Sequence, residues 1–392
     1  MAQAVTSLYI HIPFCISKCA YCDFFSIPQG KTVPDAYINA LCNEIQYRIN
    51  LLNIKHLKTI YIGGGTPSLL SKNQFVKIFK TLKENSVLLS ETEITVEVNP
   101  DDVTPDLLEA LESCGVNRLS CGIQSLNEKA LKNACRRASS KTCKNALSLI
   151  QKLWKGQLSV DLISGLPGES EKSLFDTIKE VIFYRPSHIS LYSLTIEENT
   201  PFGKQLASGH LLYDFDAADR LWLKGRDFLE THGYKWYEVS NFCSPGMECK
   251  HNLVYWTHKS YCGCGSGACG TVYYEGGEGF RWTNTSDIKQ YTEFWNQTDN
   301  PENKDLPQTS EKLDKKISEF EFFMMGLRKL EGVCEEDFIN IFGEAFSKRF
   351  AKLFSEWEKK GLCEIQNNAG KKMYAMSREG MLFLNKFNME LL

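Results

Sequence analysis

Short apolar and β-branched runs alternate with amphipathic stretches through the first half of the chain. The runs predict six strands, at Leu8–Ile12, Thr59–Ile62, Ile94–Val98, Asn117–Cys121, Leu158–Ile163 and Ile189–Leu194. Apolar residues at helical spacing predict helices between them, among them Asp35–Leu51, Lys72–Lys83, Pro105–Ser113, Ser140–Trp154 and Glu171–Phe183. This alternation is typical of parallel βα units with right-handed connections. Six units fall short of the eight of a closed TIM barrel, so we expect an α/β fold with an open, partial (β/α)6 barrel over residues 1–195.

The second half of the chain has two further patterns. Residues 196–300 are irregular and rich in glycine and aromatic residues, and we expect an accessory segment that packs against the open side of the barrel. Residues 301–392 predict a mostly helical, winged-helix-like domain with helices at Glu311–Lys329, Glu335–Ile341 and Phe346–Lys360, a hairpin around Asn367–Lys371, and a final helix capped by Ser377. A winged helix often binds DNA, but this segment lacks the basic excess of a DNA reader, so we expect no nucleic-acid partner.

Composition narrows the class of protein. Of 392 residues, 43% are apolar and 24% charged, and the net charge is −3, which is ordinary for a soluble globular protein. No apolar run reaches the ~18 residues of a membrane span. The start, MAQAVTSLYIHIPFC, lacks the charged first region and long apolar core of a signal peptide. We therefore expect a cytoplasmic protein.

Fifteen cysteines are many for such a protein, and they fall into two kinds. Most are scattered through apolar stretches, where a cysteine serves as a small buried side chain. Two groups are not scattered: Cys15, Cys19 and Cys22 near the start, and Cys243, Cys249, Cys262, Cys264 and Cys269 later in the chain.

The first group has the spacing CxxxCxxC directly after the first predicted strand. Zinc sites prefer paired CxxC spacings and four ligands. Three thiolates on one short loop fit three irons of a [4Fe–4S] cube and leave the fourth iron open to another ligand. We therefore predict that Cys15, Cys19 and Cys22 hold one [4Fe–4S] cluster.

This motif resembles that of the radical S-adenosylmethionine (SAM) superfamily, in which the open iron chelates the methionine end of SAM. Further segments strengthen the resemblance in order along the chain: YIHIPFC from Tyr9, GGGTP from Gly63, GIQS from Gly122, DLISGLP from Asp161 and YSLTIE from Tyr192. They look like the branch that contains the oxygen-independent coproporphyrinogen III oxidase HemN and the haem chaperone HemW.

The resemblance implies a SAM site made of Tyr9, Tyr21, Gly65, Thr66, Glu97, Gln124, Arg136 and Asp161. In the family the GGGTP segment holds the amino group of SAM, and Glu97 would help there. Gln124 and Asp161 match positions that hydrogen-bond the ribose, and Arg136 matches the residue that faces the carboxylate. From the residues alone, the glycines allow either a close approach to a ligand or a tight turn. The segment is not a phosphate-binding P-loop, because no Lys-Ser/Thr follows.

Three features separate oxidase from chaperone within the branch. The oxidase-type motif has an extra cysteine two residues after the third ligand, where this chain has Phe24, and an N-terminal arm longer than the 14 residues before Cys15. The chain also has HNxxYW, which in the family marks the haem-binding chaperone and which gives His251, Asn252, Tyr255 and Trp256 as candidate haem residues. Imidazole is a good ligand for haem iron, and Tyr and Trp offer flat apolar faces. A buried aromatic turn is the alternative.

The second cysteine group departs from the family. Cys262 and Cys264 stand where relatives usually have aliphatic residues, and Cys269 stands where they have His. This leaves three interpretations of the group: a second metal site, a cysteine ligand to haem, or substituted core positions.

Together these observations predict a haem chaperone of the radical SAM type, with a [4Fe–4S] cluster, SAM and haem. It would pass haem to haem-accepting membrane or respiratory proteins and meet the membrane only through those partners. Monomer and homodimer are both open from the sequence. The alternative is a coproporphyrinogen III oxidase that decarboxylates propionates through a 5′-deoxyadenosyl radical.

Overall fold

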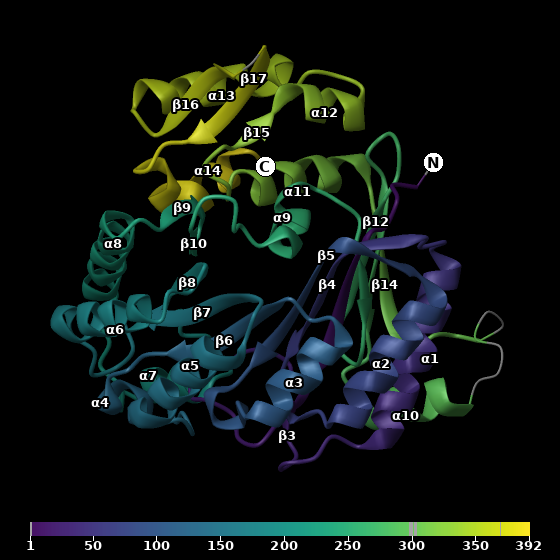
Figure 1. The fold of residues 1–392 in the computed structure, drawn as a ribbon. Coiled ribbons are helices and arrows are strands. Elements are labelled where there is room, and N and C mark those ends of the chain that lie inside the picture. Colours follow the sequence, from purple (N-terminus) through teal and green to yellow (C-terminus); the bar gives the residue numbers. More distant parts are fainter. Residues whose placement is uncertain (1, 298–300, 302–303, 369) are drawn as a thin grey trace.

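Six parallel strands form the centre of the computed structural model, which describes all residues except 1, 298–300, 302, 303 and 369 (Figure 1). They neighbour one another in chain order as β1 (Ser7–Ile12), β4 (His56–Gly64), β5 (Val87–Val98), β6 (Arg118–Gln124), β7 (Gln157–Ser164) and β8 (His188–Ser193). The connecting helices are α1 (Asp35–Leu51), α2 (Lys72–Asn85), α3 (Pro105–Cys114), α4 (Glu128–Asn133), α5 (Ser140–Leu153) and α6 (Glu171–Phe183). The predicted partial (β/α)6 barrel is confirmed. Its predicted strands and helices lie within a few residues of their places, except that β5 begins at Val87 instead of Ile94 and that α4 was not predicted.

Local sequence explains why these helices begin where they do. The hydroxyls of Ser71, Ser139 and Ser170 each accept a hydrogen bond from the backbone N–H three residues later. Such caps satisfy donors that the first turn leaves without partners. At the other end of α3, Gly115 adopts a φ of 93° that closes the helix, a conformation that glycine adopts without strain.

The two faces of the barrel sheet differ in chemistry. One face carries apolar residues such as Ile62, Val96 and Leu119, which join the apolar sides of the helices in the main core. The other face carries buried polar side chains, and residues paired in register lie together there, such as Thr95 with Arg118 and Ser159 with His188. The inside of the barrel is therefore polar, which suits a polar ligand.

The segment 196–300 is more regular than we expected. It contains α7 (Pro201–Ala207), α8 (Phe215–Thr231), β9 (Lys235–Glu238), β10 (Asn241–Cys243), α9 (Lys250–Trp256), β11 (Cys262–Cys264), β12 (Cys269–Tyr273), β13 (Gly279–Asn284) and α10 (Ile288–Gln297). Strand β11 pairs parallel to β1 at one edge of the barrel sheet, and β10 pairs antiparallel to β8 at the other. The segment thus extends the barrel at both edges.

The helix predicted from Glu311 is wrong at its start. Residues Gln308–Leu313 form β14, which pairs antiparallel with β13, and α11 (Lys315–Gly326) begins only after Asp314 caps it. Pairing with β13 decides the local structure, and Glu311 lies 3.7 Å from Arg281 across the two strands. Tertiary pairing has here overridden a weak local preference.

The C-terminal domain has the predicted helices and β-wing. Its further elements are β15 (Val333–Cys334), α12 (Glu335–Phe342), α13 (Ser347–Lys359), β16 (Cys363–Asn368), β17 (Lys371–Met376), the 3₁₀ turn η4 (Gly380–Phe383) and α14 (Leu384–Glu390). β16 and β17 pair as the expected hairpin, whose residue 369 lies outside the described residues. The Ser377 hydroxyl accepts from Gly380 N–H at 3.0 Å in the turn that leads into η4. The N-cap of the final helix α14 is Phe383, so the predicted cap of that helix by Ser377 is wrong. The domain lies at the end of the barrel where the parallel strands begin (Figure 1). Among the described residues, no helix is long and apolar enough to span a membrane.

Candidate functional site

The CxxxCxxC loop lies at the carboxyl edge of the barrel sheet. It runs between β2 (Phe14–Cys15) and β3 (Ile27–Pro28), a short parallel pair directly after β1. Cys15 is buried, Cys19 and Cys22 are half-buried, and all three thiols are free. The Thr66 hydroxyl donates to Cys15 Sγ at 3.4 Å, and burial raises the pKa of the Cys22 thiol.

No three His, Cys, Asp or Glu side chains converge on one point that would hold a single metal ion, as far as the described residues go. An iron–sulfur cube makes a different demand, because each thiolate binds a different iron. Three separated thiols on one half-buried loop fit that demand.

The GGGTP segment packs against this loop. Gly65 N–H donates to Ile12 O at 2.8 Å, and a Cβ at Gly65 would lie 2.7 Å from Phe14 O. Gly64 has a φ of +113°, and a Cβ there would lie 2.4 Å from the His11 ring. The glycines therefore bring the end of β4 onto the backbone that leads to Cys15. A side chain at either position would push Thr66 away from the thiol.

Glu97 lies beside the same glycines, inside the barrel. Its carboxylate accepts from Tyr61 O–H at 2.9 Å and from Gly64 N–H at 3.1 Å. Burial and the neighbouring Asp161 carboxylate raise the pKa of Glu97 to about 7. A buried carboxylate in this state gains from a cationic neighbour, such as the ammonium group of an amino acid.

Gln124 and Asp161 lie on the next two strands. Gln124 ends β6 with a φ of 65°, an uncommon conformation for a residue with a Cβ, and such strain is often found at binding sites. The Asp161 carboxylate accepts from the Ser120 hydroxyl at 2.9 and 3.2 Å. Burial raises the pKa of Asp161, although the Ser120 hydrogen bond opposes the shift. The two side chains offer donors and acceptors for hydroxyl groups.

Arg136 connects this edge to the cluster loop. Its Nη2 donates to Gly122 O at 2.5 Å and to Asn99 Oδ1 at 3.4 Å, and its Nη1 donates to Cys19 Sγ at 3.5 Å. The Nε atom is buried with no partner among the described residues, which is costly unless an absent acceptor occupies the site. An anionic group such as a carboxylate fits there.

The two tyrosines of the predicted site lie apart from each other. The Tyr9 hydroxyl hydrogen-bonds His11 Nδ1 at 2.9 Å, and its ring stacks on Tyr61 with centroids 6.3 Å apart. Tyr21 packs beside a small apolar cluster that includes Phe202, and it lies next to Arg136 and hydrogen-bonds the Cys19 side chain. Tyr61, Asn99 and Ser120 were missed by sequence reasoning. The sequence could have identified Tyr61, because it lies two residues before Gly63 and so faces the same side of β4.

The HNxxYW residues form α9, at the opposite end of the barrel. The Glu93 carboxylate accepts from the N–H groups of Lys250 at 3.0 Å and His251 at 2.9 Å. His251 Nδ1 hydrogen-bonds the Thr59 hydroxyl and its Nε2 hydrogen-bonds the Tyr255 hydroxyl, each at 2.9 Å. Burial lowers the pKa of His251 to about 3, so the ring is neutral. Both ring nitrogens have partners, and binding to iron would require the loss of one.

The rest of the motif lies between the barrel and α11 (Figure 1). The Tyr255 ring meets Tyr261 edge-on with centroids 4.7 Å apart. The Arg328 guanidinium lies 5.0 Å from the Trp256 ring, and Asn252 is half-buried. The structure therefore brings the four motif residues together on one helix. That helix lies next to the proposed SAM site, because the His251 ring stacks on Tyr61 with centroids 5.2 Å apart and the Tyr61 hydroxyl donates to Glu97.

Comparison with known proteins agrees with this geometry. The radical SAM superfamily model matches residues 9–181, and the HemN C-terminal domain model matches residues 313–383. The chain is 34% identical to Heme chaperone HemW of Lactococcus lactis over 91% of this chain and 90% of the relative. It is 36% identical to HemW of Escherichia coli over 85% of each protein, and 34% identical to HemW of Bacillus subtilis over 93% and 94%.

The chain belongs to the HemW family of the radical SAM superfamily.

Among solved structures, this HemW-family chain matches coproporphyrinogen III oxidase (HemN) from Escherichia coli. The TM-score is 0.81 and the sequence identity 23%, over 99% of this chain and 90% of that one. This likeness shows the fold. In the cluster loop, the Phe24 side chain is 71% exposed, so the position where the oxidase-type motif has its extra cysteine faces solvent.

The second cysteine group is mostly core in this HemW-family chain. Cys243, Cys249, Cys262 and Cys264 are fully buried, and Cys269 is half-buried with its Sγ 4.0 Å from the Tyr261 hydroxyl. The Sγ atoms of Cys262 and Cys264 lie 3.8 Å apart. The described part of the chain brings no third metal-binding side chain to these thiols, which argues against a second metal-ion site. The burial of four of the five cysteines favours substituted core positions for those four.

Proposed function

We propose that this chain binds haem and hands it to haem-requiring proteins, respiratory proteins at the membrane among them, and that it works in the cytoplasm. The observation that carries the proposal is its similarity, at 34–36% identity over most of the chain, to relatives named heme chaperone. The HNxxYW motif supports it, because all four of its named residues share one helix that the barrel and α11 hold in place.

For the cofactors, we propose that Cys15, Cys19 and Cys22 hold one [4Fe–4S] cluster and that SAM lies across the carboxyl ends of the strands. Radical SAM membership implies both cofactors. Bound together, the cluster and SAM would supply 5′-deoxyadenosyl radical chemistry at this site. The donor set fits this ligand: Arg136 has an unpartnered Nε for a carboxylate, and Glu97 has a buried carboxylate for an ammonium group.

The polar residues of the next two strands complete this site. Asp161 and Gln124 would hydrogen-bond the ribose hydroxyls, with Ser120 orienting the Asp161 carboxylate. Tyr61 would position Glu97 through its 2.9 Å hydrogen bond, while Gly65 and Thr66 would lie beside the amino group. Tyr9 and Tyr21 stay predictions for this site.

For haem, we propose that the segment with His251, Asn252, Tyr255 and Trp256 contributes to binding. Its contribution is supported by its anchors, because Glu93 and Thr59 tie α9 to the starts of two barrel strands. The side chain of His251 acts in this arrangement as a fixed part of the helix anchor.

Coproporphyrinogen III oxidation is the second candidate, favoured by the fold shared with HemN over 99% of the chain. Decarboxylation requires a propionate placed against a radical carbon in a closed site. The exposed Phe24, in place of the extra cysteine of the oxidase-type motif, speaks against it.

One sample decides between the two functions. Anaerobically reconstituted protein is titrated with haemin in one cuvette and given coproporphyrinogen III, SAM and reductant in another. We expect one equivalent of haem to bind with a shifted Soret band, and coproporphyrinogen III to remain. His251→Ala and Trp256→Ala should reduce haem occupancy, whereas the exposed His210→Ala should not. Formation of protoporphyrinogen without specific haem binding would replace the chaperone by the oxidase.

A further inference from the structure

A cavity of about 720 Å³ lies at the end of the barrel where the strands begin, remote from the cluster loop. Its walls are the N-terminal residues 2–6, the last turn of α1, the start of β4, and side chains of β12 and β13. This volume is within the range of small-molecule and cofactor sites. Neither the proposed SAM site nor α9 contributes a lining residue.

The body of the cavity is apolar and aromatic. It is lined by Leu51, Leu52, Val272, Tyr274, Phe280 and Trp282. Leu51 is 52% exposed and Tyr274 39% exposed, so apolar surface lies open to water at its rim. The Trp282 indole is buried, and its Nε1 has no hydrogen-bond partner among the described residues. Such a lining suits a flat apolar ligand with some polar edge.

The cavity is also lined by a histidine whose ring nitrogens have no hydrogen-bond partner among the described residues. His56 begins β4 and is half-buried, and neither ring nitrogen has a hydrogen bond within the described parts of the chain. Its one electrostatic neighbour of note is the exposed Glu91, which does not line the cavity. His251 is the opposite case, since both of its nitrogens are engaged and its ring is buried.

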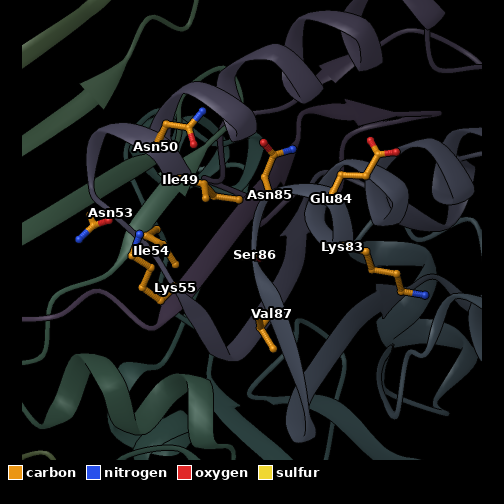
Figure 2. Close-up of a pocket in the computed structure, with 10 residues that line it drawn as sticks. All are labelled: Ile49, Asn50, Asn53, Ile54, Lys55, Lys83, Glu84, Asn85, Ser86 and Val87. Carbon is orange, nitrogen blue, oxygen red and sulfur yellow. The ribbon is translucent and has the colours of Figure 1, made fainter.

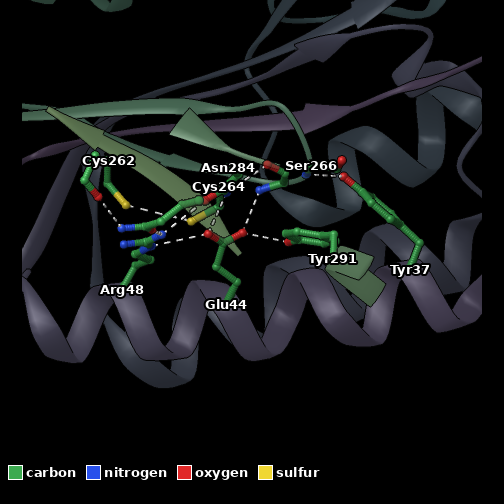
Figure 3. Close-up of polar contacts among 11 residues, drawn as sticks. Tyr37, Glu44, Arg48, Cys262, Cys264, Ser266, Asn284 and Tyr291 are labelled. Atoms are coloured by element: carbon green, nitrogen blue, oxygen red, sulfur yellow. Dashed lines mark hydrogen bonds and ion pairs between the residues drawn. The ribbon is translucent and has the colours of Figure 1, made fainter. Parts of the chain in front are cut away.

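The charged side chains that line the cavity are Lys55 and Arg48, and no acidic residue lines it. Arg48 is fixed in place: its guanidinium lies 4.6 Å from the Trp282 ring and bonds Glu44, Asn284 and Gln308 (Figure 3). Lys55 has no ion pair in the described structure and is exposed. The wall therefore favours an anion at one edge of an apolar ligand.

A second, polar cavity of about 300 Å³ shares Lys55 and Asn53 with the first (Figure 2). Its lining includes Lys83, Asn85, Ser86 and one acidic residue, Glu84, which pairs with Lys80 at 3.7 Å. Two cations and several hydrogen-bond donors thus lie next to the apolar cavity. An amphipathic ligand with carboxylate arms matches this division into an apolar and a polar part.

We propose that haem binds in the cavity beside β4, with His56 as an imidazole ligand to its iron and Lys55 paired with a propionate. The proposal rests on the proposed haem function and assigns the iron ligand to a residue outside the HNxxYW motif. The motif helix α9 then affects the haem site indirectly, because His251 hydrogen-bonds Thr59 on β4, the strand that begins at His56.

The test is a haemin titration of the full chain, read by absorbance and electron paramagnetic resonance. His56→Ala should weaken haem binding about tenfold or more and remove the signature of imidazole ligation. Free imidazole added to the His56→Ala protein should restore that signature. Lys55→Glu should weaken binding about tenfold without changing the ligation signature, because it repels a propionate. Metal-free protoporphyrin should bind wild type and His56→Ala about equally.

Controls separate this proposal from the one on which it rests. His210→Ala removes an exposed histidine distant in sequence from the cavity and should leave binding unchanged. His251→Ala should lower occupancy and keep the imidazole signature. Loss of the signature in His251→Ala, with His56→Ala like wild type, would overturn the assignment of His56 and leave the haem function standing. No specific haem binding by wild-type protein would overturn the haem function itself.

Discussion

The Arg136 Nη1 lies 3.5 Å from Cys19 Sγ, while the Nη2 of the same guanidinium donates to the carbonyl of Gly122. One side chain therefore joins the cluster loop to the strand that ends at Gln124. Cluster binding and SAM binding should therefore affect each other, because a charge placed at Cys19 changes the electric field at the place where the SAM carboxylate would bind.

The cluster is the first feature to test. Reconstituted protein should contain about four irons, because three thiolates on this loop fit one cube. Cys15→Ala, Cys19→Ala and Cys22→Ala should each abolish the visible absorbance of the cluster, and Cys42→Ala, a buried cysteine of α1, should keep it. Iron content and absorbance of the four purified variants are the measurement. A chromophore that survives all three loop substitutions would point to the later cysteines.

The ribose contacts can be tested by equilibrium SAM binding. Asp161→Ala and Gln124→Ala should each weaken binding by about 1–3 kcal/mol, the usual cost of losing a hydrogen bond to a buried polar or charged group. Asp176→Ala is the matched control, because that carboxylate is exposed and pairs only with Lys172 on the surface of α6. Equal affinities in all three variants and wild type would mean that the site is misplaced.

Glu97 predicts a pH dependence. Its pKa is raised to about 7, so the free carboxyl group is mostly protonated and neutral below that pH and ionised above it. An ammonium group binds the ionised form, so SAM affinity should rise between about pH 5.5 and 7.5, a range in which an α-amino group keeps its charge. Isothermal calorimetry across this range measures it. Glu97→Gln should bind more weakly and flatten the profile; a profile of wild-type shape in the variant contradicts the role.

The network around Glu44 predicts a stability effect. This fully buried carboxylate accepts from Arg48, Asn284, Gly265 N–H and Tyr291, and so joins α1 to β11 and α10 (Figure 3). Glu44→Gln leaves the Arg48 cation buried without its anion and should cost about 3–5 kcal/mol of unfolding free energy. Urea unfolding is the measurement. Glu84→Gln, in the exposed pair with Lys80, should change the same quantity by under about 1 kcal/mol.

Sequence alone predicted the barrel well because its signals are local. Helices α1 and α6 each begin and end at the predicted residues. Their signals, apolar spacing and caps such as Ser170, act within a few residues of the chain. The strands β10, β11 and β14 pair with β8, β1 and β13, which lie further away in the chain, and their own sequences are short and mixed. That is why the sequence predicts a helix over Glu311–Leu313, which belongs to β14, and an irregular segment over 196–300.

The candidate site divides in the same way. Spacing reveals Cys15, Cys19 and Cys22, and glycines mark a close approach at Gly65, because those features are written in consecutive residues. Pairing such as Tyr61 with Glu97 arises from strand register, and no single segment contains it. The burial of His251 also depends on Thr59 and Tyr255, so the motif predicts a candidate ligand but not whether its nitrogens are available.

The pairing of β1 with β11 has a consequence for how the chain is made. Leu8 pairs with Cys262 and Ile10 with Cys264, so β1 meets one of its two neighbours only after the chain has been synthesised as far as Cys264. Contacts this distant in sequence slow folding, because the intervening chain must be ordered first. Until then, one edge of β1 is open to pairing with another chain. Nascent chains that end between β8 and β11 should be the most prone to aggregation.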